Sequence, residues 1–335
     1  MRKIIALITA AVMTASLSGC NNRADAKKGG EAIVASLGFD LNKGVYSVFF
    51  ETVTVNSEDP SEPKRIEVVE GVGTTLSAAI EDIYKKAVRS FLFSHCSAAV
   101  LGDGINQKAF REIRSFIYEK DEINIALRFI NSKTAKELLS CERRASVALG
   151  YDLIDTLEEQ SDIFGVKYKD GFYDIEAAEK EGVNVIAIPY FEVKDKSYSV
   201  EGVTVYKDYS PVLRLSENES EVYSLLTNRR KKGNFFYKKK IHSLTHIDVE
   251  YDFFYGTELE FDVEINLKFA EKSKIAPAIE ETARSLFKMS KKVGADIFGF
   301  GNILAMRRPE IWANIKHGYY EEYLKSSLEV DVSEE

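Results

Sequence analysis

Hydrophobic and polar positions along the chain recur with periods of two residues or of three to four residues, the periods of strands and helices. Residues 32–39 and 45–55 are rich in β-branched and aromatic side chains and flank a polar turn at 40–44, so they predict a β-hairpin. A polar, proline-containing loop is expected at 56–64. The folded part of the chain therefore opens with antiparallel strands.

Helical and strand patterns then alternate through the rest of the first half. Apolar residues recur at helical spacing after the possible capping residues Thr74 and Thr75, and Thr134 with Glu137 forms a capping-box pattern. The patterns predict helices at 76–87, 110–117, 134–142 and 146–163, and strands at 91–101 and 123–130.

The second half is richer in strand patterns. Strands are predicted at 183–193 and 197–206, and the long β-rich stretch 235–269 has the pattern of a meander. Apolar residues at steps of three, four and seven predict a long helix at 275–293, which would cover one face of that sheet. The smaller elements expected here are a short helix at 219–226, a turn at 255–257 and a last strand at 328–332.

These patterns indicate an α+β fold, in which mixed and antiparallel sheets are covered by helices. At about 100 to 200 residues per domain, a chain of 335 residues forms two or three domains. We divide it into a signal peptide, a tether, an N-terminal α/β region with a candidate split near 150, and a C-terminal domain of β-meander plus long helix, at 1–19, 20–31, 32–194 and 195–335. With the split, the folded part has three small domains.

The first nineteen residues have the order of a bacterial export signal. Arg2 and Lys3 precede an uncharged apolar run at 4–15, which is shorter than the roughly 20 residues that span a bilayer. Leu17-Ser18-Gly19 then leads to Cys20, whose thiol can accept a diacylglyceryl group after cleavage. An ordinary turn after a buried helix is the alternative, but the position in the chain favours lipidation of Cys20.

Two acyl chains on Cys20, at about 0.8 kcal/mol per buried methylene, would hold the protein on a membrane. Residues 21–31, NNRADAKKGGE, have the polar composition of a flexible tether. We therefore expect a lipoprotein on the outer face of a membrane, with an otherwise soluble globular body.

The charge of the chain argues against nucleic acid as a partner. Its formal net charge is −8, and the loss of the two cations Arg2 and Lys3 with the signal makes it −10. Such a surface repels the phosphates of nucleic acids and anionic lipids. The basic run 229–232, followed by 238–240, is a local exception that we interpret as a solvated helix end and strand start.

Cys96 and Cys141 are the thiols besides Cys20, so at most one disulfide could form. A chain of this length can bury a sizeable core without a covalent link. Two buried free thiols are therefore favoured over a bridge.

The histidines give no predicted catalytic or metal site. His242 and His246 have the spacing that binds metal from one face of a helix, but their segment favours a strand, where they would share a face about 13 Å apart. His95 precedes Cys96 in an expected strand, so their side chains would point to opposite faces. A hydrogen-bonded core histidine is therefore favoured over a Cys–His nucleophile pair. We predict neither a cofactor nor a metal.

Three acidic residues, Asp248, Glu250 and Asp252, alternate along one predicted strand. Such an arrangement could collect a cation or form the solvated face of a sheet. The strand pattern favours the solvated face.

Glycines at 294, 299 and 301 superficially resemble a phosphate loop. The long helix at 275–293 reaches them by its C-terminal end, however, and the negative dipole charge there repels phosphate. We expect Gly294 to cap that helix and Phe298 and Phe300 to pack in the turn that follows.

The single tryptophan, Trp312, follows Arg308 and Pro309 in the arrangement of a helix start. Proline suits a first helical turn because its missing amide is not needed there. We predict that Trp312 is buried against the C-terminal sheet.

Three blocks of the sequence together form a family pattern. Their residues are Cys20 after Leu-Ser-Gly; Phe93, Ser94, His95 and Gly102; and, in a closing block, Asp296, Phe298, Gly299, Phe300, Gly301, Arg308, Pro309, Trp312, Ile315, Tyr319, Tyr320 and Tyr323. With Gly38, Asp40 and 136–139, they resemble the Ger(x)C, or GerAC-like, family, the C-subunit lipoproteins of spore germinant receptors. Asn21-Asn22 stands where the family usually has Trp-Asp, which leaves the subtype open.

The resemblance covers nearly the whole mature chain and implies a three-domain mixed α/β protein without catalytic residues. It implies that His95, Gly299, Gly301, Pro309 and Trp312 are structural motif positions. It also implies a place on the outer surface of the spore's inner membrane, bound to two integral membrane partners, the A and B subunits, in a complex that senses nutrients and triggers germination.

Two other classes of protein were open to the sequence: a lipid-anchored solute-binding protein of an importer, and an envelope hydrolase. A solute-binding protein has two similar α/β lobes, and the β-rich second half of the chain argues against that class. The spacing of the titratable groups argues against an envelope hydrolase. The sequence leaves open which germinant is sensed and whether this subunit contacts it.

Overall fold

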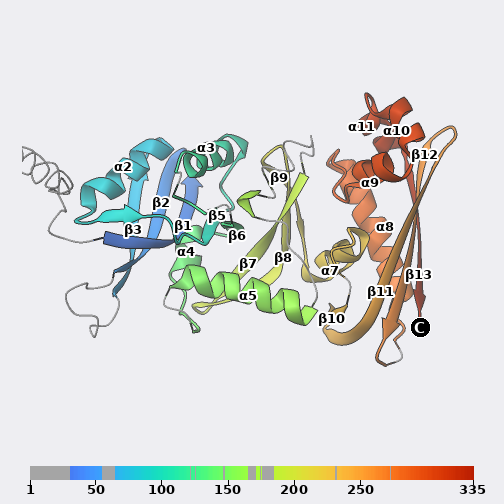
Figure 1. Ribbon diagram of the computed structural model, residues 1–335, viewed down its shortest axis with the longest axis horizontal. Helices are drawn as coiled ribbons and strands as arrows, with labels where there is room; N and C mark the ends of the chain where they lie inside the picture. Colours follow the sequence, from blue (N-terminus) through green and yellow to red (C-terminus); the bar gives the residue numbers. More distant parts are fainter. Residues whose placement is uncertain are drawn as a thin grey trace, which may run out of the picture.

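The computed structural model describes residues 31–54, 65–120, 122–124, 126–145, 148–164, 171–173, 175, 185–230, 232–271 and 273–335. In this part of the chain two sheets lie at opposite ends of an elongated body, with α7 (Glu217–Leu226) between them (Figure 1). The C-terminal sheet begins with β10 (Gly233–Tyr237). The predicted α+β class, with sheets covered by helices, is confirmed.

The N-terminal sheet has nine strands in the order β3-β2-β1-β5-β6-β7-β8-β9, and the short β4 also pairs with β1. Its middle, β1-β5-β6-β7, is parallel, and the outer strands are antiparallel. The strands are β1 (Glu31–Asn42), β2 (Val45–Thr54), β3 (Arg65–Gly73), β4 (Ser90–Leu92), β5 (Ala98–Gly102), β6 (Arg128–Ser132), β7 (Val185–Lys194), β8 (Ser197–Lys207) and β9 (Ser210–Leu215).

Helices cover both faces of this sheet. They are α2 (Leu76–Lys86) and α3 (Gln107–Tyr118) on one face and α4 (Ala135–Leu139) and α5 (Leu149–Phe164) on the other. Neighbouring strand residues therefore enter different cores: Phe50 and Leu101 pack on the α2 side, and Phe49 and Val100 on the α4 side. Because both faces are buried, these strands are almost continuously apolar.

The predicted hairpin at the start of the folded part is confirmed. β1 and β2 pair across the two-residue turn Lys43-Gly44, and both turn residues have positive φ, 49° and 81°. This turn geometry matches the twist of the strands. The helix that follows is capped as expected, since the Thr75 side chain accepts a hydrogen bond from the Ala78 N–H at 3.1 Å.

Two predicted strands are wrong in extent. The stretch 91–101 is interrupted, because a hydrogen bond from the Cys96 N–H to the Phe93 carbonyl at 2.9 Å folds a turn between β4 and β5. Of the stretch 123–130, only the end belongs to β6. Phe93, Cys96 and Leu127 are buried, but from turns. Apolar residues that look like strand in the sequence therefore fill the core from irregular backbone.

The N-terminal sheet continues across both predicted boundaries. β7 and β8 form an antiparallel hairpin whose turn, Asp195-Lys196, holds the division at 194/195. Gly150, at the candidate split, lies in the first turn of α5, where an added Cβ would come 2.6 Å from that of Ser36 in β1. The division of the folded part into three domains stays a prediction.

The C-terminal sheet has four strands in the order β10-β11-β12-β13. β11 (Lys240–Tyr255) and β12 (Leu259–Phe269) form the long predicted hairpin, and β13 (Ser327–Glu334) adds to β12 in parallel. The predicted long helix is α8 (Ala276–Lys292), which packs on one face. Residues of β12 alternate between buried and exposed, the pattern of a sheet with one open face.

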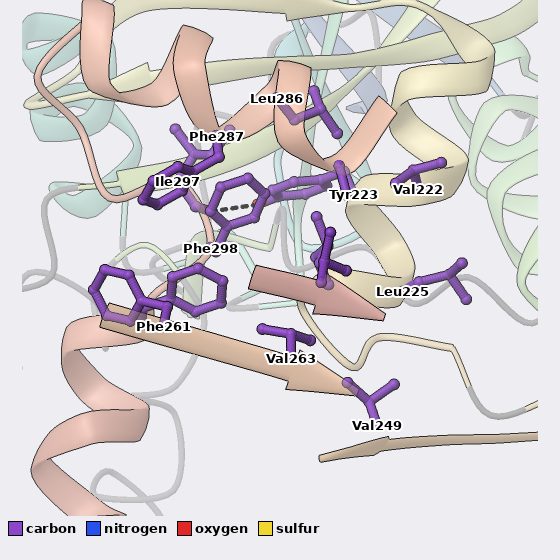
Figure 2. Packing of buried hydrophobic residues seen from close by; sticks show 14 of the residues in the cluster. Val222, Tyr223, Leu225, Val249, Phe261, Val263, Leu286, Phe287, Ile297 and Phe298 are labelled. Atoms are coloured by element: carbon purple, nitrogen blue, oxygen red, sulfur yellow. Dashed lines mark hydrogen bonds between the residues drawn. The ribbon is translucent and has the colours of Figure 1, made fainter. Parts of the chain in front are cut away.

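One apolar core joins the two sheets. It contains Val205 of β8, Tyr223 of α7, Phe261 of β12 and Phe287 of α8. Figure 2 shows side chains of α7, α8 and β12 pointing toward one another, and the Tyr223 hydroxyl donates to the carbonyl of Ile297 at 3.1 Å. Burying each large apolar side chain contributes about 1.5 to 3 kcal/mol.

Three short helices, α9 (Phe300–Arg307), α10 (Pro309–Ile315) and α11 (Tyr319–Lys325), connect α8 to β13. Pro309 begins α10, as predicted. Among the described residues, no helix has both the length and the apolar character to cross a membrane.

Candidate functional site

The closing block is organised by one buried carboxylate, Asp296, between α8 and α9. Its Oδ2 accepts hydrogen bonds from the Gly301 N–H and from the Tyr319 hydroxyl, both at 2.8 Å. Burial raises the pKa of Asp296, and these hydrogen bonds offset part of that rise. Asp296 therefore fastens the start of α9 to the start of α11.

The two glycines of the motif have separate reasons to be glycine. Gly299 precedes α9 with a φ of 73°, in the left-handed region that favours glycine. Gly301 lies against the ring of Tyr319, where an added Cβ would come within 2.8 Å of the ring carbons. Glycine at 301 therefore lets the backbone pack directly against the Tyr319 ring.

The structure also explains the glycine at 294. It has a φ of 63° directly after α8, and its carbonyl accepts a hydrogen bond from Lys207 of β8 at 2.5 Å. Phe298 in the turn that follows and Phe300 at the start of α9 are both buried. The predicted cap and packed turn are confirmed.

The predicted position of Trp312 is wrong. The side chain is half-buried on α10, and its ring meets that of Tyr319 edge-on at 5.2 Å. Pro309 ends the preceding helix, so a new short helix carries Trp312 onto α11 instead of onto the sheet. Trp312 and Gly301 therefore both contact the ring of Tyr319.

His95 is also placed differently from the prediction. It is exposed in the turn between β4 and β5, not in a strand or in the core. It lies at a cleft of about 530 Å³, together with Arg128 of β6 and Glu158 of α5. The neighbouring Cys96 is buried, and burial raises the pKa of its thiol. A thiol that keeps its proton is a poor nucleophile, so the pair lacks the chemistry of a Cys–His site.

His242 and His246 lie on β11 as predicted, but they do not share a face. A β-bulge between Leu244 and His246 shifts the alternation of the strand. His242 packs against Phe269, with its Nδ1 3.1 Å from a serine hydroxyl, and His246 is exposed opposite Lys268. Among the described residues, no three His, Cys, Asp or Glu side chains are grouped to hold a metal ion.

The acidic residues of β11 lie on the open face of the sheet, as predicted. Asp248, Glu250 and Asp252 are exposed. The register places further carboxylates beside them, because Glu250 faces Glu264 of β12, which in turn faces Asp331 of β13. Like charges directly opposite each other destabilise a sheet, so this face is strongly acidic at some cost in stability.

The two cysteines of the folded part lie as predicted, whereas the basic run 229–232 does not. Cys96 and Cys141 are free and buried, as expected. The basic run 229–232 is not wholly solvated, because Arg230 is fully buried and forms an ion pair with Glu221 of α7 at 2.6 Å. Cys20, the signal peptide, most of the tether and the loop 56–64 lie outside the described residues.

Two carboxylates, Glu51 and Asp40, hold the N-terminal region together. Asp40 belongs to the family pattern, and Glu51 is not among the predicted site residues. The first is Glu51 of β2, which is fully buried and accepts hydrogen bonds from the N–H groups of Leu149 and Gly150 at 2.6 and 2.9 Å and from the Ser36 hydroxyl at 2.8 Å. It thereby caps α5 from within the sheet. A single Glu in an apolar strand was the available signal.

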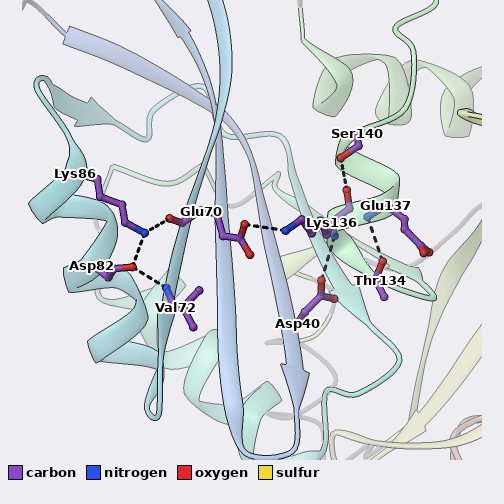
Figure 3. A network of polar contacts seen from close by, with 9 residues as sticks. All are labelled: Asp40, Glu70, Val72, Asp82, Lys86, Thr134, Lys136, Glu137 and Ser140. Atoms are coloured by element: carbon purple, nitrogen blue, oxygen red, sulfur yellow. Dashed lines mark hydrogen bonds and ion pairs between the residues drawn. The ribbon is translucent and has the colours of Figure 1, made fainter.

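The second carboxylate is Asp40, at the end of β1 (Figure 3). Its carboxylate accepts hydrogen bonds from the N–H groups of Ala135 and Lys136 at 2.7 and 3.1 Å and so caps α4. An added Cβ at Gly102 would come 2.1 Å from its Oδ1, which explains that glycine. Lys136 continues the network by pairing with Glu70 of β3 at 2.9 Å.

These features define a two-sheet α+β protein whose motif residues join helices to strands or to one another. Residues 31–193 match the family model described as the spore germination protein N-terminal domain, and residues 201–334 match that described as spore germination B3/GerAC like, C-terminal. The chain therefore belongs to the GerAC-like family of spore germination proteins. The assignment made from the sequence is confirmed.

The fold is similar to that in the crystal structure of the GerBC protein, with a TM-score of 0.53 at 12% identity over 89% of this chain and 96% of that chain. At this identity the likeness shows a shared fold. No sequence among the curated proteins matches the chain. The family confirms the predicted role as a germinant receptor subunit and leaves the importer alternative without support.

Proposed function

We propose that the chain is a lipid-anchored C subunit of a spore nutrient germinant receptor and that it acts by assembly, without catalysis. The observation that supports this is the pair of GerAC-like matches, which lie on both sheets of the structure. The contacts of Asp40, Asp296 and Gly301 each join one element of the fold to another. Residues with such contacts support a role as a scaffold. Signalling is then a property of the whole receptor and not of a catalytic site in this chain.

The proposed anchor is diacylglyceryl on Cys20, and the proposed location is the outer surface of the spore's inner membrane. β1 begins at Glu31, eleven residues after that cysteine. At about 3.5 Å per extended residue, the tether keeps the start of β1 within about 40 Å of the membrane. The N-terminal sheet is therefore the part of the body tied to the membrane.

The anchor is tested by Cys20→Ala, which should abolish palmitate labelling and release the protein from the membrane fraction. Cys141→Ala is the matched control, because that buried thiol should carry no lipid and its loss should leave labelling unchanged. Equal labelling of Cys20→Ala and the unaltered protein would contradict the proposal that Cys20 carries the lipid.

The proposed partners are the integral membrane A and B subunits that the family resemblance implies. Affinity purification from spores should co-isolate a multi-span membrane protein with this chain. Recovery of an ATP-driven importer in its place would contradict the receptor assignment and favour a solute-binding protein.

A further inference from the structure

Two long strands lie at outer edges of the sheets: β3 in the N-terminal sheet and β13 in the C-terminal sheet. An edge strand presents alternate N–H and C=O groups with which another strand can pair. On both strands, a charged pair from the adjacent helix occupies some of these groups.

On β3 the pair comes from α2 (Figure 3). Asp82 accepts the N–H of Val72 at 3.0 Å, and Lys86 donates to the carbonyl of Glu70 at 2.9 Å. The two side chains also pair with each other at 2.7 Å. The edge groups of β3 at these positions are therefore bonded to side chains.

On β13 the pair comes from α8 and repeats the same pattern. Glu280 accepts the N–H of Val332 at 3.2 Å, and Arg284 donates to the carbonyl of Val330 at 3.0 Å. The two side chains are 3.2 Å apart. The device thus occurs once in each sheet.

The geometry explains why the spacing is i, i+4 in both cases. In each pair the acid binds the N–H of one strand residue and the base binds the C=O two residues earlier, so the helix runs antiparallel to the strand. Two residues of strand advance about 6.6 Å. Four residues of helix advance about 6 Å. The two side chains therefore take the places of the backbone groups of a neighbouring strand.

Stability alone does not account for these pairs. Their side chains are 24% to 51% exposed, and exposed i, i+4 ion pairs contribute little to stability. The other outer strands, β9 and β10, are both short: β9 has six residues and contains Pro211, and β10 has five residues. Short edge strands and edge prolines disfavour pairing with another chain.

The β3 edge suits a second copy of the same chain. If two copies of β3 paired antiparallel about Glu70, Val68 of each would lie opposite Val72 of the other, and these valines are 39% and 46% exposed. Cross-strand β-branched pairs stabilise a sheet. The two Glu70 side chains would also lie opposite each other, but Lys136 of each copy, 2.9 Å from its own Glu70, offsets their repulsion. Two copies of β13 paired about Val330 would place Leu328 opposite Val332 but also Glu329 opposite Asp331 in both halves of the pair, which brings four exposed carboxylates together.

We propose that the Asp82–Lys86 pair is an edge lock that keeps β3 from forming a symmetric dimer with β3 of a second copy. The lock occupies the Val72 N–H and the Glu70 carbonyl, one donor and one acceptor that such a dimer would use. On β13 the equivalent pair is reinforced by repulsion between carboxylates, so that edge stays closed without its lock.

The test is the mass of the full-length chain in detergent, measured by sedimentation equilibrium over a range of concentrations. The unaltered chain should stay monomeric. The double variant Asp82→Ala with Lys86→Ala should approach twice the protein mass as concentration rises. A monomer at every concentration, with an unchanged circular dichroism spectrum, would overturn the proposal.

Three controls separate edge pairing from other causes. Asp82→Asn keeps an acceptor for the Val72 N–H and should stay monomeric. Glu280→Ala with Arg284→Ala removes an equivalent ion pair from β13 and should also stay monomeric. Adding Val72→Pro to the alanine pair removes the exposed N–H and should restore the monomer. Dimers that persist with the proline would place the contact elsewhere and overturn the proposal.

A milder variant covers the case in which the alanine pair unfolds the chain. Lys86→Met keeps the length and helix propensity of the side chain but frees the Glu70 carbonyl. It should dimerise more weakly than the alanine pair, with hydrogen exchange at β3 amides slowing as concentration rises. Exchange that does not depend on concentration, in a folded protein, would count against the lock.

Discussion

The two sheets of this protein solve the problem of burial in different ways. Strands of the N-terminal sheet, such as β5, are buried on both faces, because helices lie above and below them. Strands of the C-terminal sheet, such as β12, alternate strictly and leave one face to solvent. The N-terminal region is therefore a closed core, and the C-terminal sheet offers a surface to solvent.

Carboxylates show the same difference. In the closed sheet, Glu51 is fully buried and its oxygens are bonded to three donors. In the open sheet, Glu250, Glu264 and Asp331 form an exposed row of like charge. An acid in the first environment stabilises the fold, and an acid in the second weakens it.

The largest effect is expected from Glu51→Ala, in the closed sheet. It leaves the N–H groups of Leu149 and Gly150 buried without an acceptor, and the free energy of unfolding should fall by about 3 kcal/mol. Glu250→Ala, on the open face, is the matched control and should change it by less than about 0.5 kcal/mol. Denaturant unfolding measures both, and equal losses would erase the contrast between the sheets.

A smaller loss is expected at the motif that fastens the C-terminal helices. Gly301→Ala would place a methyl group against the Tyr319 ring, and overpacking of this kind costs about 1 to 3 kcal/mol. Gly256→Ala is the control, since its Cβ would have nothing within 4 Å. Thermal melting of both variants tests the account, and an unaffected Gly301→Ala would show that the ring has room to move.

The smallest effect has the opposite sign. Glu264 lies between two carboxylates, so Glu264→Lys should raise the free energy of unfolding by about 0.5 to 1 kcal/mol. Added salt should reduce the gain, because it screens exposed charges. A loss of stability at low salt would mean that the acidic face makes contacts that its register does not show.

Local pattern was enough to predict the elements whose two faces differ. The β1–β2 hairpin, the β11–β12 hairpin and α8 all carry a clear period between turn residues, and each lies where it was expected. The short β9 was missed, because Pro211 breaks its pattern. The turn at 93–97 carries buried apolar residues like those of a strand, so the sequence pattern predicts strand there.

Contacts distant in sequence could not be predicted from period or spacing. Glu51 caps a helix that begins 98 residues later, and Glu334 accepts the first N–H groups of α8 from the end of the chain. Trp312 was placed on the wrong partner for the same reason, since only the path of α10 and α11 brings it to Tyr319. The family resemblance identified the motif residues but not what they touch.

We propose that this protein works by assembly and not by turnover, and nutrient-triggered germination of spores tests that proposal. His95, His242 and His246 are the side chains that an enzymatic account would most need. Replacing each of them by Gln, at matched protein levels, should leave germination nearly intact, whereas deleting the body after the tether should abolish it and leave growth normal. Loss of the response in one histidine variant, with folding, abundance and partner binding unchanged, would contradict the account and point to chemistry at that residue.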